Sequence, residues 1–381
     1  MRLRGVGQNI VCQMVVDLDD VLVDAESLQR FVAAVLEAVG ITREDAAITA
    51  DVLVTADLTG HESHGVARLE GQYVRPVQTG QIRAGGGLVT VRETAATLVL
   101  DADNGLGHPA AKHAMDRCIA KARDAGTCVA VVRRSNHYGI AGYYPMMAAA
   151  QDMIGVCCTT AGALVVPTGG RTMLLGTNPL AFAAPARRNR PFMLDMATSV
   201  VPIGKVEVKA RRNTPLPLGW AVDGTGQPTT DAAEVLERTF GDMTGGLVPL
   251  GGLEAGHKGF GLAAMVDILS GVLAGAQVSL HVREAMGSGH GAGVGHLVAA
   301  IDIAAFFDSV DEFKDAMDTY IDELHAAPRA PGTDRIRVAG EPEFEAKEHH
   351  LRTGLPLHAG VAASLQKLGQ ELQVPPFVLL G

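Results

Sequence analysis

Apolar residues recur at helical spacing through Ala25–Val77, the first part of the chain to show a regular pattern. The pattern breaks near Gly40 and Gly60, and glycine commonly ends a helix because it adopts a left-handed backbone without strain. A long amphipathic run, Arg43–Leu58, stops just before Gly60, and a new apolar face begins at Val66. The spacing therefore predicts a set of consecutive helices over this segment.

Shorter runs rich in β-branched and apolar residues follow the glycine-rich turn at Gly85–Gly87. The pattern predicts strands over residues 89–92, 97–100, 128–132, 156–160, 180–184, 192–194 and 297–303, the first two as a hairpin. It predicts helices over residues 109–125, 143–151 and 260–274. Residues 210–257 are rich in Pro, Gly and Asp, which predicts a long surface excursion. A β-rich middle between helical ends indicates a mixed α/β protein with one domain inserted into another.

The composition is that of a folded globular chain: 47% of its 381 residues are hydrophobic and 19% are charged. A net charge of −10 gives no basic face for nucleic acid, and no apolar run reaches the length of a membrane span. The five cysteines form no CxxC pair and no metal spacing, and no leader precedes them. We expect a soluble cytoplasmic protein with no nucleic-acid or membrane partner.

The segment Glu62-Ser63-His64-Gly65, followed by Arg68, carries the strongest chemical signal. Ser63 stands where a helix N-cap would stand, so its hydroxyl could accept from a free backbone N–H. If Val66–Val77 is helical, His64 and Arg68 lie one turn apart on one face. A titratable imidazole beside a fixed guanidinium can bind a carboxylate and move a proton, which indicates an enzyme acting on a small acid.

Three other candidates that contain a histidine are weaker. His61 and His64 are spaced like metal ligands, but no carboxylate or cysteine set accompanies them, so we expect no metal. A Ser63-His64-Asp195 hydrolase is conceivable, but adjacent residues rarely orient a hydroxyl on the neighbouring ring, and no GxSxG elbow is present. His137 follows a predicted strand, where loops of α/β proteins often bind ligands.

Two glycine-rich strings bear on nucleotide binding. Gly105–Ala110 reads GxGxxA, but four residues separate it from the preceding strand and repeated βαβ units are missing, so we do not interpret it as a Rossmann fingerprint. Gly256–Gly261 contains Lys258 and precedes the helix predicted from Phe260. Since helix N-termini attract anions, this string is either a phosphate site or a glycine-rich turn with a solvated lysine.

Several short motifs, in this order and spacing, resemble one enzyme family. They are Asp57–Gly65 with Arg68, Ser135–Tyr144, Gly176–Pro185, Asp195–Ser199, Gly204-Lys205, Pro217–Ala221, Pro228–Asp231, Pro249–Gly252 and His257–Leu262. Through them the chain resembles the malate/L-lactate dehydrogenase type-2 family, over roughly residues 25–360. That family also contains sulfolactate and ureidoglycolate dehydrogenases and cyclic-imine reductases. The chain departs from its pattern in a longer Ala232–Thr244 segment and in an insertion at Leu253–Ala255.

The resemblance implies an α/β (α+β) fold whose cofactor domain is not a Rossmann fold. Its largely antiparallel mixed sheet would be inserted into a helical domain built from both ends of the chain. The implied division is a lead-in at residues 1–20, a helical substrate and dimerisation domain at 21–88 and 275–381, and an NAD(P)-binding domain at 89–274. A homodimer that shares the active site is also implied.

The resemblance further implies an NAD(P)-dependent oxidoreductase that interconverts a small 2-hydroxy acid and its 2-oxo acid. NAD(H) is favoured over NADP(H), and the substrate is a small carboxylate. The implied catalytic residues are His64, with Ser63 and Asp195 as relay partners, and His137 as the rival proton carrier; Arg68, Tyr73 and His137 would bind substrate. The implied cofactor contacts are His137, Tyr138, Thr160, Thr177, Asn178, Asp195, Met196, Ala197, Lys258 and Gly259. NADPH-dependent reduction of a cyclic imine carboxylate or keto sugar acid is the alternative activity, and a catalytically silent binding protein is a third reading.

Overall fold

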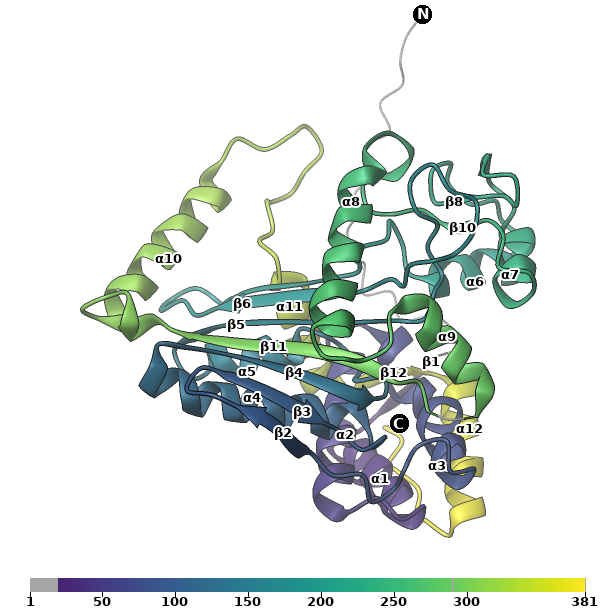
Figure 1. Cartoon of the computed structure of the whole chain (residues 1–381), viewed down its shortest axis with the longest axis horizontal. Helices are drawn as coiled ribbons and strands as arrows, with labels where there is room; N and C mark the ends of the chain where they lie inside the picture. The colour runs from purple at the N-terminus through teal and green to yellow at the C-terminus, as the bar shows by residue number, and fades with distance from the viewer. Residues whose placement is uncertain (1–19, 290, 381) are drawn as a thin grey trace, which may run out of the picture.

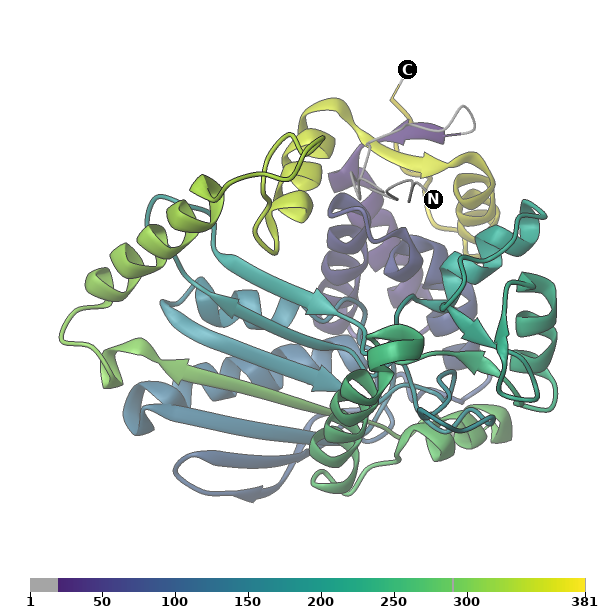
Figure 2. The same cartoon turned by 90° about the horizontal axis from the view of Figure 1, so that it is seen from above.

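A seven-stranded sheet forms the centre of the molecule, with the strand order β2-β3-β4-β11-β5-β6-β7 (Figures 1 and 2). The computed structural model describes residues 20–289 and 291–380, so Cys12 and nearly all of the predicted lead-in lie outside the described residues. The strands are β2 (Val89–Glu93), β3 (Thr97–Asp101), β4 (Thr127–Ser135), β5 (Met153–Thr159), β6 (Leu180–Ala184), β7 (Phe192–Met196) and β11 (Val294–Asp302). Among the described strands of this sheet, β3 and β4 pair in parallel and all other neighbours pair antiparallel. The predicted hairpin and the largely antiparallel mixed sheet are confirmed.

Helices α4 (Gly107–Ala125) and α5 (Tyr143–Ala149) pack against one face of this sheet. Their apolar residues form a core with the strands, in which Met115, Cys118, Val132 and Val298 are fully buried. Gly107 opens α4, where an added Cβ would lie 2.1 Å from the carbonyl oxygen of Asn136. The glycine-rich entry to α4 therefore serves close chain packing, as expected once a Rossmann fingerprint is rejected.

The two ends of the chain meet in a helical unit beside the sheet (Figure 2). Strand β1 (Asp20–Val23) pairs antiparallel with β12 (Leu355–His358). The surrounding helices are α1 (Ala25–Ala38), α2 (Arg43–Leu58), α11 (Glu341–Thr353) and α12 (Ala359–Leu372). Their apolar faces share one buried core that contains side chains from both ends of the chain, such as Leu28, Phe31, Leu365 and Phe377.

Strand β11 lies between β4 and β5, in the middle of the sheet. It belongs to the segment 275–381 that the sequence assigned to the helical domain, so the boundary predicted at residue 274 cuts through the sheet. Every residue from Val294 to Ala300 is buried, including His296, and such continuous burial is typical of a central strand. The helices α9 (Ser279–Ser288) and α10 (Val310–Ala326) flank β11 along the chain.

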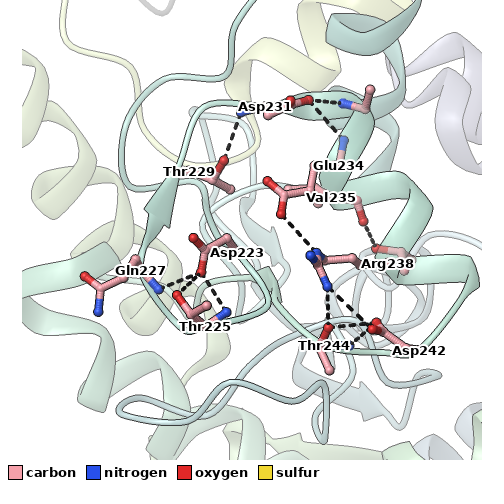
Figure 3. A network of polar contacts seen from close by, with 12 residues as sticks. Asp223, Thr225, Gln227, Thr229, Asp231, Glu234, Val235, Arg238, Asp242 and Thr244 are labelled. Carbon is pink, nitrogen blue, oxygen red and sulfur yellow. Dashed lines mark hydrogen bonds and ion pairs between the residues drawn. The ribbon is translucent and has the colours of Figure 1, made fainter.

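The segment predicted as a long surface excursion is instead an ordered layer of its own. It contains α6 (Ile203–Arg211), β8 (Ala221–Val222), β9 (Pro228–Thr229), α7 (Ala232–Phe240) and β10 (Gly246–Leu247), with the three strands in one small sheet. Val206, Leu216, Val235 and Leu247 are buried in its core. Figure 3 shows why turn residues were abundant: Asp231 caps α7, and Arg238 joins Glu234 to Asp242 and Thr244. The Asp and Gly residues end short elements here and do not mark an unstructured loop.

Helix α8 (Gly252–Val266) begins eight residues before the predicted start and continues as a π-helical turn, Asp267–Val272. Gly256–Gly261 consequently lies inside the helix, and Gly259 N donates to Leu250 O at 3.1 Å. This string therefore does not supply the free amide groups of a helix N-terminus, which were the reason to favour a phosphate site there over a glycine-rich turn. Proline and glycine before residue 260 concealed the start of the helix.

Candidate active site

A cavity of about 530 Å³ lies where the segment after α2 meets the ends of β4 and β5 and helix α9. Its volume falls within the range typical of small-molecule sites. The residues that line it include His64, Arg68, Gln72, Gln81, Asn136, His137, Thr160, Thr177, Val282 and Met286. The strongest sequence signal, the His64–Arg68 segment, therefore faces His137 across one cavity.

His64 and Arg68 reach the cavity from two short 3-10 helices, Glu62–His64 and Val66–Arg68, and not from one α-helix. Ser63 is not an N-cap: its Oγ lies 2.9 Å from Nδ1 of His64. The expectation that adjacent residues would not make this contact is wrong, because the tight 3-10 turn brings the two side chains together. Arg68 Nε donates to Ser63 O at 2.7 Å, and within residues 20–289 and 291–380 the terminal guanidinium nitrogens have no partner, so they can bind a ligand.

Asp57, near the end of α2, links the segment 62–68 to the helical unit by a hydrogen bond. Its Oδ2 accepts from Val66 N at 2.8 Å, and an added Cβ at Gly65 would lie 1.9 Å from Oδ1. Gly65 is therefore required so that the chain can pass over the carboxyl group. Burial raises the pKa of Asp57 to about 8, with Glu62 adding to the effect and the Val66 N–H opposing it.

This buried carboxyl predicts a pH-dependent stability. Its pKa is about 8 in the folded chain and about 4 in an unfolded one, so between these values unfolding releases a proton. As the pH rises through this window, the free energy of unfolding of the wild type should thus fall by about 1.4 kcal/mol per pH unit more than that of an Asp57→Asn variant. Urea denaturation of both proteins at pH 5, 6 and 7 measures the difference. An identical pH dependence in the variant would contradict the assignment.

His137 has a fixed tautomer. Gly139 N donates to its Nδ1 at 3.2 Å, and Tyr73 Oη lies 2.7 Å from the same nitrogen. An Nδ1 that accepts from a backbone N–H carries no proton, so the proton of the neutral ring sits on Nε2. The ring stacks on His64 with centroids 5.6 Å apart. Tyr73 is fully buried behind His137, so it supports that ring and does not line the cavity as a substrate contact.

Both histidines of the cavity favour the neutral form. Burial, followed by the neighbouring His61 and Arg68, lowers the pKa of His64 to about 4. The pKa of His137 is also lowered well below its usual value, first by burial and then by the neighbouring His64, His108 and Arg68. Arg68 is thus the permanent positive charge of the cavity among its described lining residues.

The other predicted cofactor residues divide into two groups. Tyr138, Thr160 and Thr177 line the cavity, although the Tyr138 ring is buried and stacks on His296 at 4.6 Å. Asn178 is a structural residue: it is fully buried, and its side chain bonds to Ala161 N and Ala263 O. Its amide groups are occupied by the fold, which leaves them unavailable to a cofactor.

Asp195 lies in a second cavity of about 330 Å³, with His61, Asp51 and Lys347 among its lining residues. Its Oδ2 accepts from Gly142 N at 2.6 Å, and its pKa is raised, chiefly by burial. Asp195 is not among the lining residues of the cavity that contains His64, and the Nδ1 of His64 faces Ser63 instead. The predicted Asp195–His64 contact is absent from the described contacts of the two residues.

Met196 and Ala197 follow Asp195 at the end of β7, beside Thr177, whose carbonyl oxygen accepts from Thr198 N at 2.8 Å. Lys258 and Gly259 line neither cavity. Lys258 is exposed on α8, and Gly259 packs so tightly that an added Cβ would lie 2.3 Å from Leu250 O. Within the described chain, no group of three or more His, Cys, Asp or Glu side chains is placed to hold a metal ion.

Among the cavity residues that escaped the sequence analysis are Gln72, Gln81, Val282 and Met286. Gln72 lies four residues beyond Arg68, and this spacing was a signal that could have identified it. The other three lie far from any recognised motif, and only the folded chain brings them to the cavity. None of the helices within residues 20–289 and 291–380 is long and apolar enough to cross a bilayer.

Residues 23–366 match the sequence profile of the malate/L-lactate dehydrogenase family. The chain belongs to this family. It is therefore an oxidoreductase of the malate/L-lactate dehydrogenase type, which acts on 2-hydroxy acids. It is 42% identical over 362 residues to a malate dehydrogenase of Pyrococcus horikoshii, covering 94% of this chain and 98% of the relative. A solved structure of malate dehydrogenase from the same organism superimposes with a TM-score of 0.86 at 40% identity, covering 95% and 99% of the two chains.

Two further relatives of this family carry different substrate names. An L-sulfolactate dehydrogenase of Methanocaldococcus jannaschii is 37% identical over 347 residues, which cover 91% of this chain and 96% of the relative. A ureidoglycolate dehydrogenase (NAD(+)) of Escherichia coli is 35% identical over 320 residues, which cover 84% and 87%. Family membership thus establishes the reaction class and leaves the substrate to the architecture of the cavity.

Proposed function

We propose that His64 carries the proton in the interconversion of a 2-hydroxy acid and its 2-oxo acid, while Arg68 binds the carboxylate. The single observation that carries this proposal is the presence of His64, Arg68 and His137 around one cavity. In the oxidation direction, the hydroxyl proton passes to Nε2 of His64, the C2 hydrogen leaves as hydride, and the C2–O bond becomes a carbonyl. A histidine suits this role because its two ring nitrogens can be protonated and deprotonated near neutral pH.

The contacts of the two histidines favour His64 over His137 as the proton carrier. A serine hydroxyl can donate to Nδ1 of His64 or accept from it, so the imidazolium that forms on proton uptake is tolerated. At His137, the Gly139 N–H opposes a proton on Nδ1, and Nε2 already carries one. His137 is thus suited to donate an Nε2–H hydrogen bond to the substrate oxygen and polarise the carbonyl.

Binding of the carboxylate prepares His64 for its role. Arg68 is one of the groups that lower the pKa of His64. A carboxylate paired with the two free guanidinium nitrogens compensates this charge, so the pKa of His64 rises in the complex. The same fork fixes C2 relative to the two histidines, which holds the reacting atoms in a productive geometry.

NAD(H) is the cofactor that we favour, supported by the NAD(+)-dependent ureidoglycolate dehydrogenase among the relatives. The cofactor, when bound, accepts the hydride from C2 or returns it. Thr177 offers a small polar group on the cavity wall, which suits the carboxamide of a nicotinamide ring, whereas the buried Thr160 hydroxyl accepts from Gly295 N at 3.0 Å and only shapes the wall. Met196 and Ala197 directly precede Thr198, whose N–H donates to Thr177 O. They are therefore the next candidates to hold the nicotinamide ring. Asp195 stays a candidate cofactor contact from the second cavity.

Absorbance of NADH and of NADPH, followed with pyruvate, oxaloacetate and other 2-oxo acids, tests the proposal. We expect oxidation of NADH with at least one 2-oxo acid and weaker activity with NADPH. If NADH or NADPH is oxidised only with a cyclic imine carboxylate, the substrate is the imine and not a 2-oxo acid. No turnover with any of these pairs, in a protein that binds NADH, would indicate a catalytically silent binding protein.

A homodimer is our proposal for the assembly. The π-helical turn after α8 packs on the sheet through residues such as Leu269 but leaves Ile268, Val272 and Leu273 exposed by 57–66%. On the same face, Val129, Val156 and Phe182 of the sheet are only partly buried. Large apolar side chains left exposed beside a sheet face in this way are typical of an interface between subunits. The four described cysteines are free and buried, which agrees with a reducing cytoplasmic environment.

An Ile268→Asp variant is expected to dissociate this dimer, because a carboxylate would be buried at the apolar interface. Size-exclusion chromatography with light scattering should give about twice the chain mass for the wild type and the chain mass for the variant. Lys258→Asp, at an exposed position of the preceding helix α8, serves as the control for an added aspartate. A monomeric wild type, or a variant that stays dimeric, would contradict the assignment of this surface.

A further inference from the structure

Gln72 reaches the cavity because the helix that carries it is a π-turn. Residues Leu69–Val74 form this turn, and Arg75 N donates to Glu70 O, five residues earlier. Such a wide turn brings Arg68, Gly71 and Gln72 to the cavity, while Leu69, Tyr73 and Val74 are buried in the core. The turn therefore presents a carboxamide one turn beyond the guanidinium that binds the substrate carboxylate.

Gln81 presents a second carboxamide to the same cavity. Its Nε2 lies 4.0 Å from the position that a Cβ would take at Gly289, at the end of α9. Among the described residues, neither the Gln72 nor the Gln81 side chain has a hydrogen-bond partner, although both side chains are partly buried. Amide groups held in a cavity without partners are available to a ligand.

The charge of the cavity limits what its far end can bind. Arg68 is its one permanently charged side chain among the described lining residues, and no carboxylate lines it. The histidines beside Arg68 favour the neutral form, since burial lowers the pKa of His64 to about 4. If Arg68 binds the carboxylate of the substrate, a second carboxylate would meet carboxamides and the apolar Val282 and Met286. An anion that leaves water without a cationic partner pays a large desolvation cost.

We infer that Gln72, with Gln81, selects a 2-hydroxy acid that has one carboxylate and a neutral hydrogen-bonding group at its far end, such as a carboxamide. A glutamine side chain both donates and accepts, so it matches a carboxamide or ureide group in full and a carboxylate only in part. The inference rests on the proposed roles of Arg68 and His64, and it makes Gln72 a specificity-determining residue.

Three substrates test the inference with NAD: L-malate, its monoamide with the carboxamide at the far carbon, and L-lactate, which lacks a far polar group. We expect kcat/KM to be highest for the monoamide. In Gln72→Leu, kcat/KM for the monoamide should fall about tenfold, as for one lost hydrogen bond, with lactate changed less than about twofold. Gln72→Arg should raise kcat/KM for malate about tenfold relative to the monoamide, because it supplies the missing cation.

Each outcome separates the inference from the underlying function. Gln370→Leu, at an exposed position of α12 outside the cavity, is the matched control and should leave all three rates near the wild type. A wild type that prefers malate, or a Gln72→Leu variant that loses lactate and monoamide activity equally, would overturn the specificity role while leaving the dehydrogenase intact. Absence of turnover with all three acids, together with 2-oxo acids failing to oxidise NADH, would overturn the proposed function itself.

Discussion

Replacing His64 by alanine is expected to lower kcat by about a hundred- to ten-thousand-fold, which is the usual contribution of a positioned acid–base group. The side chain faces Ser63 through Nδ1, and removing it leaves the hydroxyl proton of the substrate without an acceptor. Stopped-flow and steady-state kinetics with the best substrate measure this loss. The dissociation constant of NADH, measured by fluorescence, should stay close to the wild-type value because Thr177, Met196 and Ala197 are unchanged.

His137→Ala is the matched comparison for this variant. It removes an Nε2–H donor rather than a proton carrier, so we expect a smaller loss in kcat, about ten- to a hundred-fold. Tyr73 loses its partner in that variant, which makes thermal stability a necessary second readout. If both variants fold and kcat falls more in His137→Ala than in His64→Ala, His137 is the proton carrier and the proposal for His64 fails.

The pH profile provides an independent check on His64. In the free enzyme its pKa is about 4, so kcat/KM for oxidation should be flat above pH 6 and decline as the ring takes up a proton at lower pH. In the substrate complex, a carboxylate on Arg68 raises this pKa, so the decline in kcat should begin at a higher pH than the decline in kcat/KM. Identical profiles for the two parameters would contradict the coupling of Arg68 to His64.

The sequence predicted the sheet well because each strand carries a compact apolar or β-branched run. The strands at 180–184 and 89–93, for example, stand where the pattern put them, within a residue or two. The pattern predicted the strand that became β11 but not its neighbours, because chain order cannot reveal that a late strand inserts between β4 and β5. The pattern also failed to predict α7 and the start of α8, because Asp, Gly and Pro there cap short elements of an ordered layer.

The chemistry was predictable from sequence only where the residues lie close together in the chain. His64, Ser63 and Arg68 share one short segment, and their mutual contacts follow from its tight turns. His137 was recognised as a rival, but its tautomer depends on Gly139 N and on Tyr73, which lies 64 residues away. Asp195 was expected beside His64 and lines the other cavity instead, a separation that no spacing in the chain encodes.

Arg68→Ala is expected to lower kcat/KM by about a thousandfold, mainly through KM, because the substrate carboxylate loses two charge-assisted hydrogen bonds. Arg68→Lys keeps the charge but not the fork, so its loss should be smaller, about a hundredfold. Steady-state kinetics over a range of substrate concentrations separate the two parameters. An exposed arginine outside the cavity, Arg30 on α1, gives the control variant Arg30→Ala, which should be unaffected.

The two Arg68 variants are expected to differ in their pH profiles. This difference distinguishes a charge effect from a folding defect. Arg68 lowers the pKa of His64, so Arg68→Ala should move the low-pH decline of kcat/KM upward, whereas Arg68→Lys should leave it near the wild-type position. Arg68 Nε also holds Ser63 O, and a variant that merely disordered this turn would lose kcat without shifting the profile. An Arg68→Ala enzyme with unchanged KM would show that the carboxylate binds elsewhere in the cavity, and the specificity inferred for Gln72 would fail with it.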